Sequence, residues 1–114
     1  MKTTHLIDFL AEHAEVHFPR FADFNDHGFN VADITGVAPG WEMHPDTDEF
    51  FYVIDGEFEV TLMMPEGPEH HVAGAGTAFV VPKGIWHKPA APGGAKFIFH
   101  TPGESLTSDA EDPR

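Results

Sequence analysis

The chain has 114 residues, which is enough for one packed domain but not for two. Nineteen acidic residues against six basic ones give a formal net charge of −13, which argues against nucleic acid or an anionic membrane surface as a partner, because both require a basic footprint. The absence of cysteine excludes a disulfide framework and a thiolate metal site.

The N-terminal stretch MKTTHLIDFLAEHAEV lacks the uninterrupted apolar run of a signal peptide. No other segment is apolar for long enough to cross a bilayer as a helix. We therefore expect a soluble cytoplasmic protein.

Residues 4–17 form the one good helix candidate, which Thr4 could cap. Its apolar residues recur at helical spacing; they are Leu6, Phe9, Leu10 and Ala14. His13 and His17 stand four residues apart in this segment, a spacing that could hold a metal. No third ligand lies nearby in the sequence, so exposed helix positions are the favoured interpretation of this pair.

From Phe18 onward, glycine and proline interrupt the sequence every eight to ten residues, and short β-branched or aromatic runs such as FFYVI and AKFIF lie between them. Many short strands with turn signals at this interval indicate an all-β sandwich or barrel. We expect one domain over residues 1–114, with the helix at about 4–17, the barrel at about 18–101 and a loose acidic tail at 103–114.

Asp55-Gly56 is the strongest hairpin signal, because a two-residue type I′ turn needs positive φ at both central residues. We therefore predict two strands joined by this turn. Alternation of side chains along the strands then places an apolar set on one face; it comprises Phe51, Val53, Phe58, Val60 and Leu62, with Glu49 at its end.

Glu49 is the unexpected member of this face, because an unpaired buried charge is costly. Its carboxyl group must be protonated, paired or bound to a cation, unless it lies at the mouth of the strand and reaches water. On the opposite face, Phe50 and Tyr52 point outward and indicate a covered surface. Either the N-terminal helix or a second subunit could cover it.

His44 and His87 are the histidines whose positions indicate chemistry. The segment from Trp41 to His44 reads as extended, so Glu42 and His44 project from the same face. Downstream, His87 follows a rigid Pro-Lys-Gly turn at the start of another strand. Imidazole and carboxylate together form a usual ligand set for a divalent first-row metal, although the residues alone do not bring these segments together in space.

Two spaced motifs resemble the signature of the cupin superfamily. The first has the form G-x5-H-x-H-x4-E-x6-G, and this sequence has Gly36, Glu42, His44, Glu49 and Gly56 at those positions. The second has the form G-x5-P-x-G-x2-H-x3-N. It is matched at those positions by Gly76, Pro82, Gly84, His87 and Ala91.

The resemblance covers residues 36–91. The segments HPDTDEFFYVIDGE and VVPKGIWHKP are most similar to those of small single-domain cupins described as sugar-phosphate-isomerase-like. It implies an all-β jelly-roll barrel with a short N-terminal helix, frequently a homodimer, with a divalent metal inside the barrel (Fe, Mn, Ni or Zn). By position, it implies His44, Glu49 and His87 as metal ligands. A cation at this site would explain why Glu49 faces inward.

The sequence departs from the family pattern at Glu42, which replaces the first histidine, and at Ala91, which replaces the closing asparagine. Three interpretations follow for Glu42. It binds the metal through oxygen as a fourth ligand, which shifts preference toward harder ions such as Mn or Fe. Alternatively it is a catalytic general base beside a three-ligand metal site. In the third interpretation the barrel has lost its metal and keeps only a pocket.

Two functions from different classes are compatible with these residues. One is a metal-dependent isomerase, lyase or oxygenase acting on a small metabolite, in which an apolar barrel wall excludes water; that wall would comprise Phe51, Val53, Phe58, Phe79 and Phe97. The other is a non-catalytic module that binds a small ligand or carbohydrate. Lys83 and Lys96 could meet an anionic substrate, but solvated surface positions are favoured for them.

Overall fold

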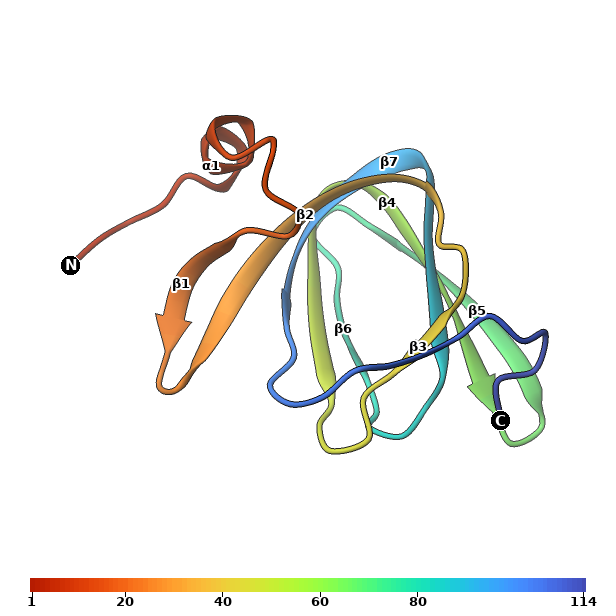
Figure 1. The fold of residues 1–114 in the computed structure, drawn as a ribbon. Helices are drawn as coiled ribbons and strands as arrows, with labels where there is room; N and C mark the ends of the chain where they lie inside the picture. The colour runs from red at the N-terminus through yellow and green to blue at the C-terminus, as the bar shows by residue number, and fades with distance from the viewer.

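The structure, a computed structural model, describes residues 1–114 and is built mainly of strands, with one short helix (Figure 1). Its elements are α1 (Leu6–Glu12), β1 (Arg20–Phe24), β2 (His27–Val37), β3 (Trp41–Met43), β4 (Glu49–Met64), β5 (Gly67–Gly74), β6 (Ala78–Val81), β7 (His87–His100) and β8 (Leu106–Ser108). All strand pairs are antiparallel and belong to one sheet. Along it the order is β1-β2-β7-β3-β8, and β4 pairs with β5, β6 and β7. The sheet curls into a barrel, which confirms the all-β class and the short N-terminal helix.

Strand β4 is continuous through Asp55-Gly56, so the prediction of a hairpin turn there is wrong. The reversal comes later, at Pro65-Glu66, where Met64 pairs with Gly67. Gly56 does have the positive φ of +77° that the turn would need, but it uses this freedom to bend the strand. A Cβ on Gly56 would clash with the carbonyl oxygen of Gly94 in β7, so glycine permits the close approach of the two longest strands.

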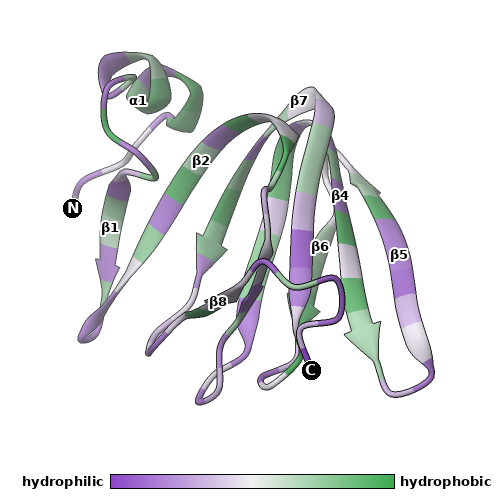
Figure 2. Ribbon diagram, turned by 45° about the vertical axis from the view of Figure 1, so that its right-hand side comes forward, coloured by the Kyte–Doolittle hydropathy of each residue, from purple (hydrophilic) through white to green (hydrophobic).

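The predicted apolar face of β4 is nevertheless correct. Phe51 and Val53 before the bend, and Phe58 and Val60 after it, are buried together with Glu49. In a straight strand, residues 53 and 58 would point to opposite faces. The bend and its irregular register with β7 turn both halves toward the interior, as a β-bulge does. Hydrophilic and hydrophobic bands alternate along the barrel strands (Figure 2).

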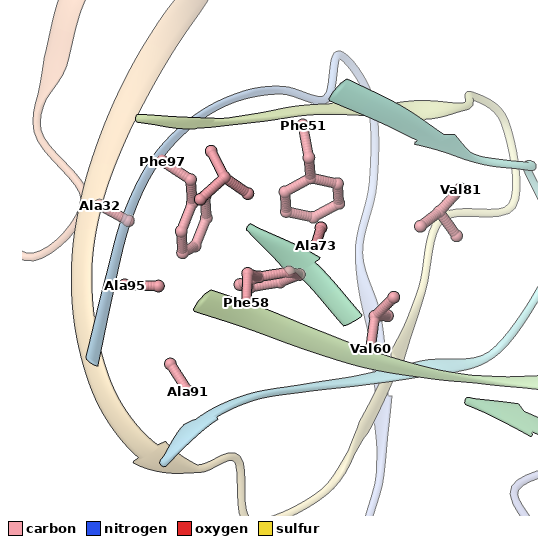
Figure 3. Packing of buried hydrophobic residues seen from close by; sticks show 10 residues of the cluster. Ala32, Phe51, Phe58, Val60, Ala73, Val81, Ala91, Ala95 and Phe97 are labelled. Atoms are coloured by element: carbon pink, nitrogen blue, oxygen red, sulfur yellow. The ribbon is translucent and has the colours of Figure 1, made fainter. Parts of the chain in front are cut away.

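The core consists of ten buried residues that line the inside of the barrel (Figure 3); they are Ala32, Phe51, Val53, Phe58, Val60, Ala73, Val81, Ala91, Ala95 and Phe97. Three phenylalanine rings form its centre. The ring centroid of Phe58 lies 5.2 Å from that of Phe51 and 4.6 Å from that of Phe97, distances at which aromatic pairs attract. The part of the barrel interior around these three rings is therefore filled with side chains.

Helix α1 is shorter than predicted: it covers Leu6–Glu12 rather than 4–17, and the side chain of His5, not Thr4, caps it by accepting a hydrogen bond from the N–H of Asp8. The sequence after residue 12 explains the early end, because β-branched and aromatic residues followed by a proline disfavour further helical turns. The helix contacts β2 (Figure 1). No helix of the structure is long and apolar enough to span a membrane.

The C-terminal tail is not loose throughout, contrary to the prediction for 103–114. Residues 106–108 form β8, which pairs with β3 so that Thr107 stands opposite Glu42. The guanidinium of Arg114 donates hydrogen bonds to the carbonyl oxygens of Met64 and Pro65. The tail thus continues the sheet at the end of the barrel where the candidate site lies.

Candidate metal centre

Four side chains from three strand ends meet inside the barrel. Glu42 lies on β3, His44 directly follows β3, Glu49 begins β4 and His87 begins β7. The antiparallel register of β3 and β7 makes Glu42 and His87 direct partners. Since directly opposed residues share a face, the sheet itself aims both side chains at one point.

Two further hydrogen bonds join the loop before β4 to the turn before β7. The N–H of Gly84 donates to the carbonyl oxygen of His44 over 2.8 Å, and the N–H of Lys83 donates to the carboxylate of Asp48 over 2.9 Å. The rigid Pro-Lys-Gly turn is therefore fixed against the segment that carries His44 and Glu49. These bonds hold ligands from distant parts of the sequence in one place.

The four side chains present their donor atoms to a shared centre. One potential ligand atom from each lies within 4.8 Å of all the others. Glu49 Oε1 lies 3.2 Å from His44 Nε2 and 3.0 Å from His87 Nε2. Glu42 Oε1 lies 3.5 Å and 3.2 Å from the same two nitrogens, so both carboxylates have nearly the same relation to the imidazoles.

The far nitrogen of each imidazole is held by a backbone carbonyl. Nδ1 of His44 lies 3.2 Å from the carbonyl oxygen of Glu104, and Nδ1 of His87 lies 3.2 Å from that of Ile85. A carbonyl oxygen only accepts hydrogen bonds, so each Nδ1 carries a proton. In the neutral ring, Nε2 then has a free lone pair directed at the shared centre, which is the arrangement of a metal-ligating histidine.

Two hydroxyl groups from the C-terminal segment complete the surroundings. The Thr101 hydroxyl donates to Oε2 of Glu49, which leaves Oε1 toward the imidazoles. The Ser105 hydroxyl lies 3.0 Å from Nδ1 of His44. Both contacts orient a potential ligand, and neither residue belongs to the motifs that identified the site.

Burial and pairing shift the pKa values of all four groups. Burial lowers the pKa of each histidine, but hydrogen bonds to Glu42 and Glu49 outweigh it and raise the pKa of His44 to about 10 and that of His87 to about 9. Hydrogen bonds to the two histidines lower the pKa of Glu42 to about 2. Burial opposes ionisation of Glu49, yet the same kind of hydrogen bonds lower its pKa below the ordinary value.

The protein without a metal therefore holds two imidazolium groups against two carboxylates near neutral pH, a set with no net charge. A divalent cation could replace the two Nε2 protons and keep that balance. The donor chemistry thus fits a divalent metal ion, with Glu42, His44, Glu49 and His87 as the residues available to hold it.

The centre opens into a cavity of about 770 Å³. Glu42, His44 and Glu49 lie on its wall, together with the rings of Phe51, Phe58 and Phe97, as the predicted apolar wall requires. Val53 and Phe79, also assigned to that wall, pack in the surrounding core instead. The polar centre and the apolar wall face the same space.

The other residues singled out in the sequence lie elsewhere. The helix ends before His13, whose Nδ1 lies 2.8 Å from the carbonyl oxygen of Phe9, and His17 stacks on Phe18. Lys83 is exposed, and Lys96 lies near Asp33 and Asp55. The expectation of exposed helix positions for the two histidines is therefore wrong for the helix, and only His17 is exposed; of the two lysines, Lys83 has the expected surface position and Lys96 is half-buried. Thr101, Glu104 and Ser105 have no sequence signal of their own.

Comparison with known proteins gives the same family as the motifs. The profile of the cupin domain family matches residues 33–101. The uncharacterised protein YdbB of Bacillus subtilis is 34% identical over 67 residues, which are 59% of this chain and 56% of that protein. The match therefore covers just over half the length of this relative.

Solved structures share the fold over longer stretches. A cupin-2 domain protein from Shewanella frigidimarina has a TM-score of 0.76 and 28% identity, with 87% of this chain and 93% of that chain covered. Hydroquinone 1,2-dioxygenase from Sphingomonas has a TM-score of 0.60 and 21% identity, with 72% and 63% covered. From the matched profile, the motifs and the barrel together, this chain belongs to the cupin domain family.

Proposed function

We propose that the protein binds one divalent first-row transition metal through Glu42, His44, Glu49 and His87 and uses it to act on a small molecule in the cavity. The single observation that carries the proposal is the convergence of these four side chains, three of them buried, with their donor atoms within 4.8 Å of one another. Two imidazoles and two carboxylates favour the harder ions of this series, Mn or Fe, over ions that select thiolates.

Glu42 serves as the fourth ligand in this proposal. Its Oε1 stands at nearly the same distances from the two Nε2 atoms as that of Glu49. The ligand role therefore has more support than the catalytic-base role that the sequence left open.

The proposed chemistry is that of an isomerase, lyase or oxygenase. A bound divalent ion would act as a Lewis acid on an oxygen of the substrate. The chain itself supplies the surroundings: the phenylalanine wall excludes water, and Thr101 and the carbonyl of Glu104 orient Glu49 and His44. The dioxygenase with a similar barrel supports only the point that this fold can accommodate catalysis.

Elemental analysis tests the metal. The protein should be purified without chelators or a polyhistidine tag, and we expect about one equivalent of metal per chain. Less than a tenth of an equivalent, unchanged after incubation with Mn(II) or Fe(II), would contradict the proposal and support the interpretation that the barrel has lost its metal.

Two substitutions separate the roles of Glu42. If it is a ligand, Glu42→Gln lowers metal content, whereas Glu42→His restores the histidine of the family motif and retains the metal. If it is a base, Glu42→Gln keeps the metal and loses turnover. Unchanged metal content and turnover in both variants would exclude any role for Glu42 in the site.

The alternative function is a non-catalytic module that binds a small ligand, with the metal as an anchor or absent. The mixed wall of the cavity, apolar except at one polar end, is compatible with it. A metal-loaded protein that binds small molecules but turns none over would favour this alternative.

We further propose a cytoplasmic homodimer with neither nucleic acid nor membrane as partner. The outward side chains of Phe50 and Tyr52 remain half-buried and α1 contacts β2, which leaves the outer face of β4 for a second copy. Light scattering of the wild type and of Val80→Asp, a substitution on the neighbouring strand, tests this: a monomer in both cases contradicts it.

A further inference from the structure

We propose that the cavity takes an uncharged aromatic molecule, with its ring against the phenylalanine wall and one polar oxygen toward the metal centre. The inference deepens the proposed function and rests on it for the polar end of the ligand. Phosphorylated sugars and small carboxylates, by contrast, would be poor ligands. Three observations carry this inference: the rings that line the cavity, the absence of lysine and arginine from its wall and the two carboxylates of the metal centre.

Phenylalanine is the residue type that contributes most to the apolar wall. Phe18, Phe51, Phe58, Phe97 and Phe99 all line the cavity. The volume of the cavity, about 770 Å³, and its apolar wall suit a ligand with one or two rings. Pockets of about 300–1,000 Å³ with apolar walls are typical of small-molecule sites. Flat aromatic ligands add edge and stacking contacts with such rings, which aliphatic ligands of equal size do not make.

No lysine or arginine lines the cavity. The charged residues on its wall besides His44 are Glu42, Glu49 and Asp109, all acidic. Arg20, Lys96 and Arg114 lie beside acidic partners outside it. Lys88 follows His87 on β7, projects from the opposite face and lies over the ring of Trp41, 4.7 Å from its centroid. The remaining two, Lys2 and Lys83, are exposed.

The metal centre adds little net attraction for an anion, because the two carboxylates of Glu42 and Glu49 offset the two charges of a divalent ion. An anion that entered the cavity would lose its hydration against an apolar wall that neither lysine nor arginine lines. A neutral molecule avoids that cost.

Isothermal titration with a matched pair of probes tests the proposal. Benzamide and benzoate have nearly the same shape and both offer an oxygen, but only benzoate is charged; acetamide lacks the ring. We expect benzamide to bind at least about tenfold more tightly than benzoate and acetamide, in the Mn(II)-loaded and in the metal-free protein alike. The metal-free arm separates this inference from the proposed metal site, because the phenylalanine wall does not depend on the metal.

Two exposed positions in the tail give a matched control. Asp109→Lys places a cation on the cavity wall and should raise the affinity for benzoate several-fold, with the affinity for benzamide unchanged. Glu111→Lys makes the same change of charge, but residue 111 does not line the cavity, so it should alter neither affinity.

Several results would overturn the inference. Benzoate or glucose 6-phosphate binding more tightly than benzamide in both forms would show that the cavity selects anions. Equal affinities for acetamide and benzamide would exclude recognition of the ring, and no binding of any probe at 10 mM would exclude the ligand class. A preference for benzamide in protein that cannot be loaded with metal would instead contradict the proposed function and leave the cavity's selectivity standing.

Discussion

Two regions of this molecule pair histidine with glutamate at the same distance, and only one has the features of a site. At exposed positions of β4 and β5, Nε2 of His70 lies 3.0 Å from a Glu59 oxygen, and Nε2 of His71 lies 3.0 Å from a Glu69 oxygen. Inside the barrel, Nε2 of His87 lies 3.0 Å from Glu49. Distance alone does not distinguish them.

Burial and convergence do distinguish them. The side chains of His70 and His71 are 53% and 52% exposed, whereas those of His44 and His87 are 5% and 1% exposed. Each surface histidine has one glutamate, while each buried histidine has two. Solvent screens an exposed pair, but a buried set must be balanced from within. The interior groups balance one another: two carboxylates lie within hydrogen-bonding reach of two imidazoles.

The largest expected effect is the pH dependence of metal affinity. Binding must displace one proton from His44 and one from His87, whose pKa values of about 10 and about 9 lie above neutrality. The affinity for Zn(II) or Mn(II) should therefore increase as pH rises, by up to about 100-fold per pH unit between pH 6 and 7, because two protons are released. Competition titrations with a chelator of known affinity measure this slope; a flat profile would show that the histidines do not bind the metal through Nε2.

Removal of one buried imidazole is expected to have the next largest effect. His87→Ala should lower metal affinity by more than about 100-fold, because loss of a mere outer partner of a ligand already costs 10–100-fold. His70→Ala is the matched surface control: it should leave metal affinity unchanged and alter the free energy of unfolding by no more than about 0.5 kcal/mol. Equal losses of metal in both variants would remove the contrast between the two regions.

A pair of threonines sharpens the comparison further. Thr101→Val removes the hydroxyl that donates to Glu49, with little change of shape, and should weaken metal binding about 10- to 100-fold. Thr61→Val removes a hydroxyl that lies 3.1 Å from Nδ1 of the exposed His70 and should have no such effect. Metal titration of both proteins, with circular dichroism to confirm folding, decides between positioning of a ligand and plain packing.

The smallest expected effect is on the stability of the metal-free protein. Because the pKa values of His44 and His87 are raised in the folded state, protonation of these residues stabilises the folded metal-free protein. This contribution is fully present below about pH 6.5 and is lost as pH rises toward 9–10. The lowered pKa of Glu42 stabilises it above about pH 4.5, and that contribution is lost as pH falls toward 2. The Tm should thus be highest between about pH 4.5 and 6.5 and fall by several degrees by pH 9, as calorimetry of chelator-treated protein can measure. A Tm that rises over this range would contradict the assigned shifts.

The sequence predicts the fold class and the inward face of β4 because alternation of apolar side chains and the spacing of the motifs are local properties. It cannot tell what a glycine with positive φ does. Gly56 suits a tight turn and a bend in a continuous strand equally well, and only the approach of Gly94 decides between them. The length of α1 is missed for a related reason: its periodicity continues past the point where the helix stops.

The candidate site, too, is predicted from the sequence only in part. Glu42, His44, Glu49 and His87 stand out by residue type and spacing, but their meeting depends on the register between β3 and β7, which the residues alone do not fix. Thr101 and Ser105 have no such sequence signal, since isolated hydroxyl residues near an acidic tail are common. Thr101 directly follows β7, and Ser105 directly precedes β8, a short strand that pairs with β3 in a segment whose composition predicted looseness.

The contacts of residues 101–105 with Glu49 and His44 have a consequence for the order of events during synthesis. A ribosome produces all four donor residues before it reaches this segment, so a nascent barrel would expose them without their final alignment. Ion capture would then be completed late, and removal of the strand at 106–108 should yield a barrel that folds but releases its ion faster.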